Sequence, residues 1–369
     1  MKKIIDPVPV ELIKSELTED KKLRDTNKCH NEIYIVTWQN APNVVREIGR
    51  LREIAFRAYG GGSGEEIDLD SFDTCDNPYK QLIVWDPESE KILGGYRYIC
   101  GPDIKIDANG QPILATSHMF HFTEKFVKEY LPYTIELGRS FVTLEYQSTR
   151  ESGAKALFTL DNLWDGLGAI SIMRPDMEYF FGKFTMYPDY NRHARNCILT
   201  FLKKHFQNPE EDKLVIPVDS MLIKIDEAEE REILQEYVET DFKADYKILN
   251  GLVRKEGVNI PPLVNAYMGL SPTMKFFGTA INEEFGDVEE SAILIKISDI
   301  RSEKVTRHFE SFIPTDYLMF NLAKLKQKRE LRRAIRKEKR IQRRTERLKR
   351  KSERIAKLEA RINARKEEQ

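Results

Sequence analysis

The chain has 369 residues, 41% of them hydrophobic, so it can bury a substantial core and is not disordered throughout. It has no run of about 18 apolar residues, so the sequence predicts no helix that spans a bilayer. The net charge of -1 conceals a division, because residues 322–369 hold 21 Lys and Arg against 7 Glu, whereas the remainder holds 38 basic and 53 acidic residues. This asymmetry is typical of a basic tail on an acidic globular body.

The first half of the chain predicts alternating strands and helices. Residues 31–38 are rich in β-branched and aromatic side chains and predict a strand. A helix is expected from Pro42 to the glycines at 60–62, since proline favours the first helical turn and glycine the end. Residues 81–86 and 92–100 then predict two strands joined as a hairpin.

The second half adds further elements with less regular spacing. We expect a strand at 134–145, and at 259–297 a helix that begins at a proline, a turn region punctuated by glycine, and a late strand. Mixed order of this kind favours an α/β or α+β fold with a mixed sheet. The helices expected here are 124–131, 154–173 and 193–206.

The tail gives the chain three predicted parts, namely an N-terminal extension (1–30), one domain (31–320) and a basic helical tail (321–369). The tail favours helix because no Gly or Pro follows Pro314. We expect a long basic helix that docks on an anionic membrane surface or attracts an acidic carrier protein. Nonspecific nucleic-acid binding and a solvated extension with no partner are alternatives.

The cysteines and the N-terminal residues bear on location. The four cysteines lie far apart without a C-x-x-C pair, which argues against a zinc site or a disulfide framework. The first residues contain no apolar segment typical of a signal peptide. We therefore expect a cytoplasmic protein, peripheral on the inner membrane face if the tail binds lipid.

Two groups of charged residues interrupt this pattern. "EEIDLDSFD" places Asp68, Asp70 and Asp73 in the loop after the first long helix. "YTIELGRSFV" places Glu136 and Arg139 three positions apart in a predicted strand, where an odd spacing puts side chains on opposite faces. A bulge at the intervening Gly138 would return both side chains to one face.

In their order along the chain, these motifs resemble the N-acyltransferase branch of the GNAT superfamily. That branch contains acyl-homoserine-lactone synthases and the bacterial ornithine or glycine N-acyltransferases, sometimes labelled hemolysin-like. The resemblance rests on the D-x-D-x-x-D loop, Arg97 at a strand end, and the E-x-G-R-S strand at Glu136–Ser140. Further matching segments are "MFHF" (119–122), "LWDGL" (163–167), "YFFGKF" (179–184) and "IPPLVNAY" (260–267).

The resemblance implies a GNAT-like mixed central sheet flanked by helices and an amide-forming enzyme. It implies transfer of a long, optionally 3-hydroxylated, acyl chain to the α-amine of glycine or ornithine. The segment "RESGAK" (150–155) matches the coenzyme A loop of ordinary GNAT enzymes poorly, since Lys155 replaces the small final residue. We therefore expect no bound cofactor, with the phosphopantetheine thioester of acyl carrier protein as donor. A lactone synthase that uses S-adenosylmethionine and a noncatalytic scaffold remain alternatives.

The expected site has a catalytic pair and a substrate-binding set. Glu136 is the candidate base, because most of a free amine is protonated at neutral pH and must lose a proton before it attacks a thioester. Arg139 is its catalytic partner, and a structural ion pair between the two is the alternative. The substrate-binding residues expected are Asp68, Asp70, Asp73, Arg97, Ser140, Phe120 and Phe122. The alternative for the three aspartates is a solvated acidic turn, for Arg97 an exposed arginine at a strand end, and for the two phenylalanines plain core. No metal is expected, since His118 and His121 have no third ligand.

Overall fold

A computed structural model describes residues 1–312 except 148, 209–212 and 238–240, and of residues 149–157 it describes the backbone alone. Residues Met1–Phe312 form one compact unit. The basic helix expected at 321–369 and the expected boundary at residue 320 lie outside the described residues.

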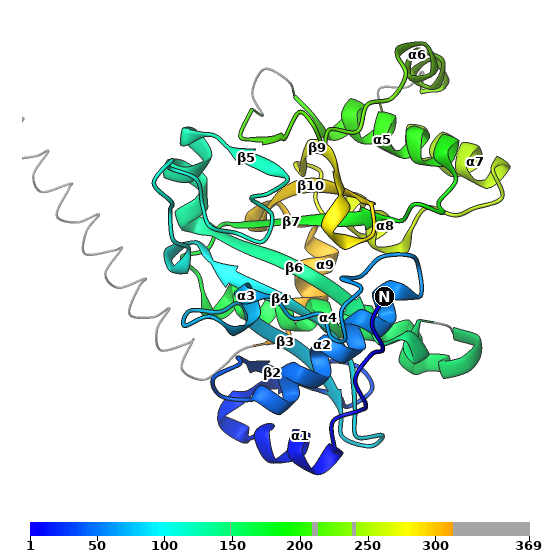
Figure 1. The fold of residues 1–369 in the computed structure, drawn as a ribbon. Helices are drawn as coiled ribbons and strands as arrows, with labels where there is room; N and C mark the ends of the chain where they lie inside the picture. The colour runs from blue at the N-terminus through cyan, green and yellow to red at the C-terminus, as the bar shows by residue number, and fades with distance from the viewer. Residues whose placement is uncertain (148, 209–212, 238–240, 313–369) are drawn as a thin grey trace, which may run out of the picture. The chain divides into compact units, whose positions relative to one another are not determined.

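An eight-stranded sheet forms the centre of this unit (Figure 1). Its order is β1-β2-β3-β4-β6-β7-β10-β9, and β6 and β7 are its one parallel pair in the described part of the chain. The strands are β1 (Lys22–Asp25), β2 (Glu32–Val36), β3 (Lys80–Asp86), β4 (Lys91–Cys100), β6 (Thr134–Val142), β7 (Tyr179–Met186), β9 (Lys275–Asn282) and β10 (Val288–Lys296), and a separate two-stranded sheet contains β5 (Phe120–Phe122) and β8 (Val215–Pro217).

Helices flank both faces of the large sheet (Figure 1). They are α1 (Val10–Glu16), α2 (Pro42–Arg57), α3 (Ser71–Thr74), α4 (Thr149–Met173), α5 (Arg192–Phe206), α6 (Glu227–Glu236), α7 (Phe242–Lys255), α8 (Pro262–Met268) and α9 (Ser302–His308). The short 3-10 turns are Glu19–Lys21, Gly101–Asp103, Leu131–Tyr133, Leu144–Tyr146, Glu283–Phe285 and Ile297–Asp299.

The predicted mixed α/β class is confirmed, and so are the β3–β4 hairpin, the long helix α2 and strand β6. The short helix expected at 124–131 is present, with α-helical residues at 124–125 and a π-helical turn over Phe126–Tyr130. One local prediction was wrong, because the expected turn region before β10 contains strand β9. Residues 1–30, expected to precede the domain, contribute α1 and β1, and β1 pairs with β2 in the sheet.

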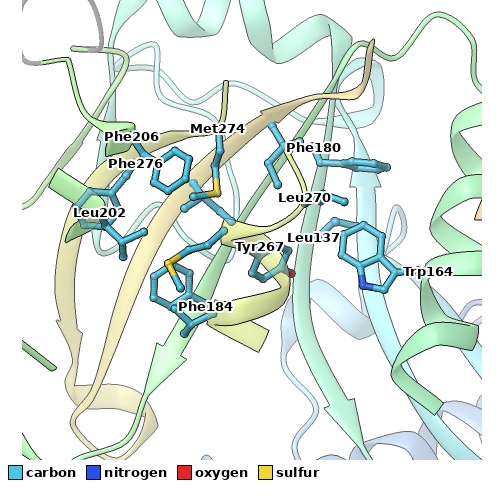
Figure 2. Packing of buried hydrophobic residues seen from close by; sticks show 14 of the residues in the cluster. Leu137, Trp164, Phe180, Phe184, Leu202, Phe206, Tyr267, Leu270, Met274 and Phe276 are labelled. Carbon is cyan, nitrogen blue, oxygen red and sulfur yellow. The ribbon is translucent and has the colours of Figure 1, made fainter. Parts of the chain in front are cut away.

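One face of the sheet carries a continuous apolar cluster, which we call the main cluster. It packs strand residues such as Leu137 and Phe180 against Trp164 of α4 and Tyr267 of α8 (Figure 2). The glycines at 166 and 168, unusual within a helix, let α4 approach its neighbours closely. A Cβ at Gly168 would lie 2.4 Å from the carbonyl oxygen of His308, and one at Gly166 would lie 2.8 Å from Leu82 Cδ2.

The opposite face carries two separate apolar clusters. The α2 cluster joins α1 and α2 to the sheet through residues such as Ile48, Ile83 and Val288. The aromatic cluster joins β5 and the π-helical turn to the sheet, and it contains Tyr79, Ile99, Phe120, Phe122, Phe126, Phe181, Ala292 and Leu294. The charged residues singled out in the sequence lie between these two clusters.

Candidate active site

Strand β6 contains a bulge opposite Tyr96 of β4. Arg97 pairs directly with Gly138, whereas two residues, Arg139 and Ser140, lie opposite Tyr96 alone. Arg139 has φ of 47°, in the left-handed region that residues with a Cβ rarely adopt. The bulge expected at this point is present, but Arg139 carries the positive φ instead of Gly138.

The bulge turns Glu136 and Arg139 toward the same face of the sheet. Glu136 shares the face of Arg97, because Arg97 pairs with Gly138 two positions further along β6. Arg97 and Arg139 both contact Asp70, with nitrogen to Oδ2 distances of 2.8 and 3.9 Å. Within the described residues Glu136 makes no ion pair with Arg139. The alternative of a structural ion pair between these two residues is therefore wrong.

Polar side chains follow one another across this face in what we call the polar band. Along β10, Leu294 and Ala292 belong to the aromatic cluster, Glu290 is polar, and Val288 belongs to the α2 cluster. Strand β7 repeats this order, with Lys183 and Thr185 between Phe181 of the aromatic cluster and Tyr187, which packs against the α2 cluster, so the band separates the two clusters. Its members are Arg52, Asp68, Asp70, Asp73, Gln81, Arg97, Glu136, Arg139, Lys183, Thr185, Asn282 and Glu290.

The acidic loop lies over one half of the band, and its three aspartates have different environments. Asp73 is fully buried and pairs with Arg52 at 2.9 Å and with Arg97 at 3.1 Å. Asp68 is also buried and lies 2.8 Å from Arg52. The side chain of Asp70 is 32% exposed and caps α3 by accepting from two backbone amides. Asp70 is therefore the loop carboxylate that an ammonium substrate can reach.

Arg97 is enclosed by the loop. Its guanidinium pairs with Asp70 and Asp73 and lies 5.1 Å from the centroid of the Tyr79 ring. Both ion pairs use Nη1, whereas Nε has no hydrogen-bond partner among the described residues. The side chain is 3% exposed, so little of it is open to a phosphate or substrate carboxylate. The geometry therefore indicates that Arg97 holds the loop against the strand.

Arg139 is bound less firmly than Arg97. Its Nε lies 3.2 Å from Asp68 Oδ2 without hydrogen-bond geometry, and its guanidinium lies 4.1 Å from the centroid of Phe285. Its side chain remains 16% exposed. Burial lowers the pKa of Arg139, and nearby Asp68 opposes that shift. An arginine with unused donors at a partly open position can bind an anion.

Glu136 is buried without a satisfied carboxyl group. Neither of its carboxyl oxygens accepts a hydrogen bond of good geometry in the described part of the structure, although the Tyr79 hydroxyl lies close enough to act on it. Burial raises the pKa of Glu136 above its ordinary value, whereas Arg97, the adjacent Tyr79 hydroxyl and Lys183 oppose the rise. A buried carboxyl of this kind is unfavourable for folding and is typical of groups that act as acids or bases.

Ser140 and the two phenylalanines have no polar contact with Glu136 among the described side chains, although Phe181, which pairs with Glu136 in register, contacts Phe122. Ser140 is half-buried near the Tyr96 hydroxyl, whose side chain belongs to the main cluster on the other face. Phe120 and Phe122 are buried in the aromatic cluster, and the Phe122 ring lies 5.5 Å from that of Phe181. These rings are packed core here, and contact with substrate stays a prediction for all three residues.

Sequence reasoning missed the pair of Lys183 and Glu290. The pairing of β6 with β7 ends at Leu137 and Gly182, so Lys183 is the first β7 residue beyond it. Lys183 forms an ion pair with Glu290, whose side chain is buried, while that of Lys183 is largely buried. In the sequence, Lys183 lies within the matching segment "YFFGKF", and no local signal there indicates its pairing with Glu290.

Other features contribute less to the site. "RESGAK" lies in the first turns of α4, and its side chains are outside the described ones. Among the residues that the structure describes, no cluster of His, Cys, Asp and Glu could hold a metal ion, and no helix is long and apolar enough to cross a membrane. A hollow of about 470 Å³ lies beside β9 and includes Leu199 and Phe277, but not Glu136 or Arg139.

Comparison with known proteins identifies related sequences. Residues 51–154, which include the acidic loop, Arg97, Glu136 and Arg139, match the acetyltransferase (GNAT) domain family. A glycine N(alpha)-acyltransferase of Bacteroides thetaiotaomicron is 63% identical over 313 residues, which cover 85% of this chain and 91% of that protein. One of Phocaeicola vulgatus is 60% identical over 314 residues, which cover 85% of this chain and 94% of that protein. No solved structure matches the chain.

Proposed function

Since the chain belongs to the GNAT family of N-acyltransferases that includes these two glycine N(alpha)-acyltransferases, we propose that it transfers a long fatty acyl group to the α-amine of glycine. The product is an N-acylglycine, a lipoamino acid. Glycine is preferred to ornithine as acceptor because both relatives are named for glycine.

The observation that carries this proposal is the buried carboxyl of Glu136 beside the bulge in β6. Its oxygens accept no hydrogen bond of good geometry among the described residues, and burial raises its pKa. A carboxylate whose pKa is shifted toward neutrality accepts a proton from an ammonium group more readily than an ordinary one. In this role Glu136 deprotonates the glycine amine, directly or through water, before the nitrogen attacks the thioester carbonyl.

The bulge supplies a place for the thioester. Beyond Leu137 and Gly182, the backbone groups of β6 that point away from β4 have no strand partner. An amide in this segment can donate to the thioester carbonyl oxygen and stabilise the negative charge that develops there. This use of a bulged strand is what the resemblance to GNAT enzymes implies.

Arg139 and Asp70 fit the two charges of the glycine zwitterion. The side chain of Arg139 is 16% exposed and can bind the carboxylate, while the partly exposed Asp70 can hold the ammonium group. Asp68, Asp73 and Arg97 act indirectly in this scheme, because their mutual ion pairs hold Asp70 and Arg139 in place.

The proposed donor is an acyl group on the phosphopantetheine arm of acyl carrier protein, 3-hydroxylated or unsubstituted. The tail (322–369) has 21 basic residues and suits both an acidic carrier protein and an anionic membrane surface, where the lipid product would be released. We propose a cytoplasmic enzyme that is peripheral on that surface.

The test is a reaction of the purified full-length protein with long-chain acyl carrier protein and with the matching acyl-coenzyme A. Each donor is offered glycine, ornithine, serine and alanine, and products are identified by mass spectrometry. N-acylglycine from the carrier-protein donor supports the proposal. A preference for ornithine refutes glycine as the acceptor. Equal or faster turnover of acyl-coenzyme A refutes acyl carrier protein as the donor, and absence of any amide product refutes acyl transfer itself.

A further inference from the structure

Lys183 lies where strands β6 and β7 separate. The parallel pairing runs from Thr134 and Tyr179 to Leu137 and Gly182 and stops there. Lys183 follows Gly182 directly, just as Gly138 and the bulge follow Leu137. The lysine and the bulge therefore flank the same opening between the strands.

The side chain of Lys183 points toward the face that holds Glu136. Lys183 pairs in register with Ala292 of β10, and Phe181 pairs with Leu294. Three of these residues, Phe181, Ala292 and Leu294, belong to the aromatic cluster, so Lys183 shares their face. The side chain is 11% exposed, so this ammonium group is largely shielded from water.

Glu290 holds Lys183 in this position. It forms an ion pair with Lys183, accepts from Thr185 Oγ1 at 3.4 Å, and accepts from Asn282 Nδ2 at 3.3 Å. Its side chain is 3% exposed. A buried carboxylate with three polar neighbours is well oriented, so the Lys183 ammonium group is fixed against one partner.

The reaction proposed above leaves a proton requirement that Glu136 does not meet. When the C–S bond of the thioester breaks, its electron pair goes to sulfur, and an alkyl thiolate is a poor leaving group unless it is protonated. We propose that the Lys183–Glu290 pair donates the proton to the departing thiolate sulfur. This inference rests on the proposed acyl transfer and adds a second catalytic residue to it.

The proton count balances with these groups. The glycine ammonium loses two protons as it becomes an amide, and the thiolate takes up one. Glu136 accepts the first proton and later releases it to solvent. The second proton leaves the nitrogen after its attack on the carbonyl carbon, and it replaces the one that the Lys183–Glu290 pair gave to sulfur.

Other groups near Glu136 suit this role less well. Arg97 and Arg139 cannot lose a proton in a protein. Burial lowers the pKa of Lys183 well below its ordinary value, with Arg139 adding to the effect and Glu136 opposing it, which makes the lysine a stronger acid. Tyr79 is the rival, because its hydroxyl lies near Glu136, but burial raises its pKa well above the ordinary value.

Two substitutions separate proton donation from charge. Lys183→Met removes both, whereas Lys183→Arg keeps a positive charge that cannot be given up as a proton. With an acyl carrier protein donor, both variants are expected to turn over about 100-fold more slowly than the wild type. If Lys183→Arg retains wild-type turnover, the lysine acts by charge alone and the proposal is overturned.

The leaving group gives the second test. The N-acetylcysteamine thioester and the thiophenyl ester of one acyl chain are compared with glycine as acceptor, since an aryl thiolate leaves without a proton. Lys183→Met is expected to slow the alkyl ester at least tenfold more than the aryl ester. Equal losses on both esters overturn the proposal, as does selective loss in Tyr79→Phe instead.

Two controls distinguish the possible failures. Lys204→Met removes a lysine that lies outside the polar band and pairs with buried Asp245 at 2.7 Å. Its turnover of both thioesters should equal that of the wild type. Thermal unfolding of each Lys183 variant checks that it folds. If the wild-type enzyme forms no N-acylglycine with any donor, the proposed function fails; if it does and the Lys183 variants match it, only this inference fails.

Discussion

The guanidinium carbon of Arg139 lies 4.1 Å from the centroid of the Phe285 ring, above one of its faces. This contact favours the arginine by about 0.5–2 kcal/mol. It offsets part of the cost of the left-handed backbone at Arg139, which is about 1–2 kcal/mol for a residue with a Cβ. The contact with the ring therefore helps to stabilise an arginine at the strained position of the bulge.

Replacement of Arg139 should separate backbone strain from activity. Arg139→Ala loses the ring contact but keeps the strain, whereas Arg139→Gly loses both. We expect the glycine variant to be more stable than the alanine variant by about 1 kcal/mol in urea unfolding, while both are poorly active. Equal stability of the two variants would show that the φ of 47° is not strained.

Glu136→Gln should abolish most of the activity and leave a stable protein. Loss of a general base lowers turnover by about 10²–10⁴-fold. Glutamine keeps the shape of the side chain and avoids a buried charge, so the free energy of unfolding at neutral pH should rise. Turnover near the wild-type value would mean that another group deprotonates the amine.

The stability gain of Glu136→Gln should depend on pH. The pKa of Glu136 is raised above its ordinary value of 4.5 by burial, so the native state binds more protons than the unfolded state above that pH. Ionisation then destabilises the wild-type fold as pH rises through the raised pKa. Urea midpoints of the two proteins should coincide below about pH 4.5 and diverge above it. Wild-type turnover should fall as Glu136 becomes protonated.

Asp73→Asn should destabilise the fold far more than Asp70→Asn. Asp73 is fully buried and pairs with Arg52 and Arg97, so its replacement leaves two buried guanidinium groups short of a partner, at a cost of about 3–5 kcal/mol. Asp70 is partly exposed, and asparagine caps a helix as well as aspartate does, so about 1 kcal/mol or less is expected. Urea unfolding measures both changes, and similar losses would contradict this ranking.

The two variants should also differ in their effect on the reaction. Asp70→Asn is expected to raise KM for glycine, because Asp70 is the loop carboxylate open to an ammonium group. Unchanged KM would place the ammonium group elsewhere, with Glu136 the nearest alternative. The Asp73 variant is informative only for stability, since its misfolding would lower all kinetic constants together.

Gly168→Ala and Gly166→Ala form a matched pair within α4. The new Cβ at 168 meets the backbone carbonyl of His308, which cannot move without shifting the end of α9, and a loss of about 1–3 kcal/mol is expected. At 166 it meets the side chain of Leu82, which can change rotamer, so the gain in helix propensity of about 1 kcal/mol offsets the clash. Thermal unfolding compares the two, and a larger loss at 166 would contradict this account.

Deletion of residues 322–369 should separate chemistry from membrane binding. The deleted segment carries 21 basic residues, and each cation near an anionic bilayer contributes about 1 kcal/mol. Turnover with a soluble carrier-protein donor should remain, while sedimentation with vesicles rich in anionic lipid should be lost. Vesicle binding by the truncated chain would assign the membrane contact to the folded unit, and loss of turnover would assign the tail to donor docking.

The sequence predicted the parts of the fold that depend on local pattern. Helix α2 begins at Pro42 and ends before the glycines, as expected, and β3 and β4 pair as the hairpin that the turn residues between them predicted. The sequence also predicted a bulge in β6. Glu136 and Arg139 are three positions apart, so their side chains can share one face of the sheet only if the strand contains one extra residue. The sequence did not predict the positive φ of Arg139, because a cation held over the ring of Phe285, in the turn between β9 and β10, leaves no local signal.

Pairings between distant segments could not be predicted in the same way. Arg52 lies in the middle of a helix, and its partners Asp68 and Asp73 are defined only once the loop folds back over α2. Lys183 is flanked by aromatic residues, and its partner Glu290 lies more than one hundred positions away. The order of the strands in the sheet decides which of these charged residues meet, and the local sequence pattern does not predict that order.

The short ladder between β6 and β7 divides the large sheet into two parts. Among the described residues, Thr134–Leu137 with Tyr179–Gly182 is the one strand pairing between these parts, and the α2 cluster and the contact of Arg139 with Phe285 join them further. A long, narrow acyl chain that enters between β6 and β7 beyond Leu137 and Gly182 would break no backbone hydrogen bond of this ladder. Such a chain would have Lys183 of β7 on one side and the bulge of β6 on the other.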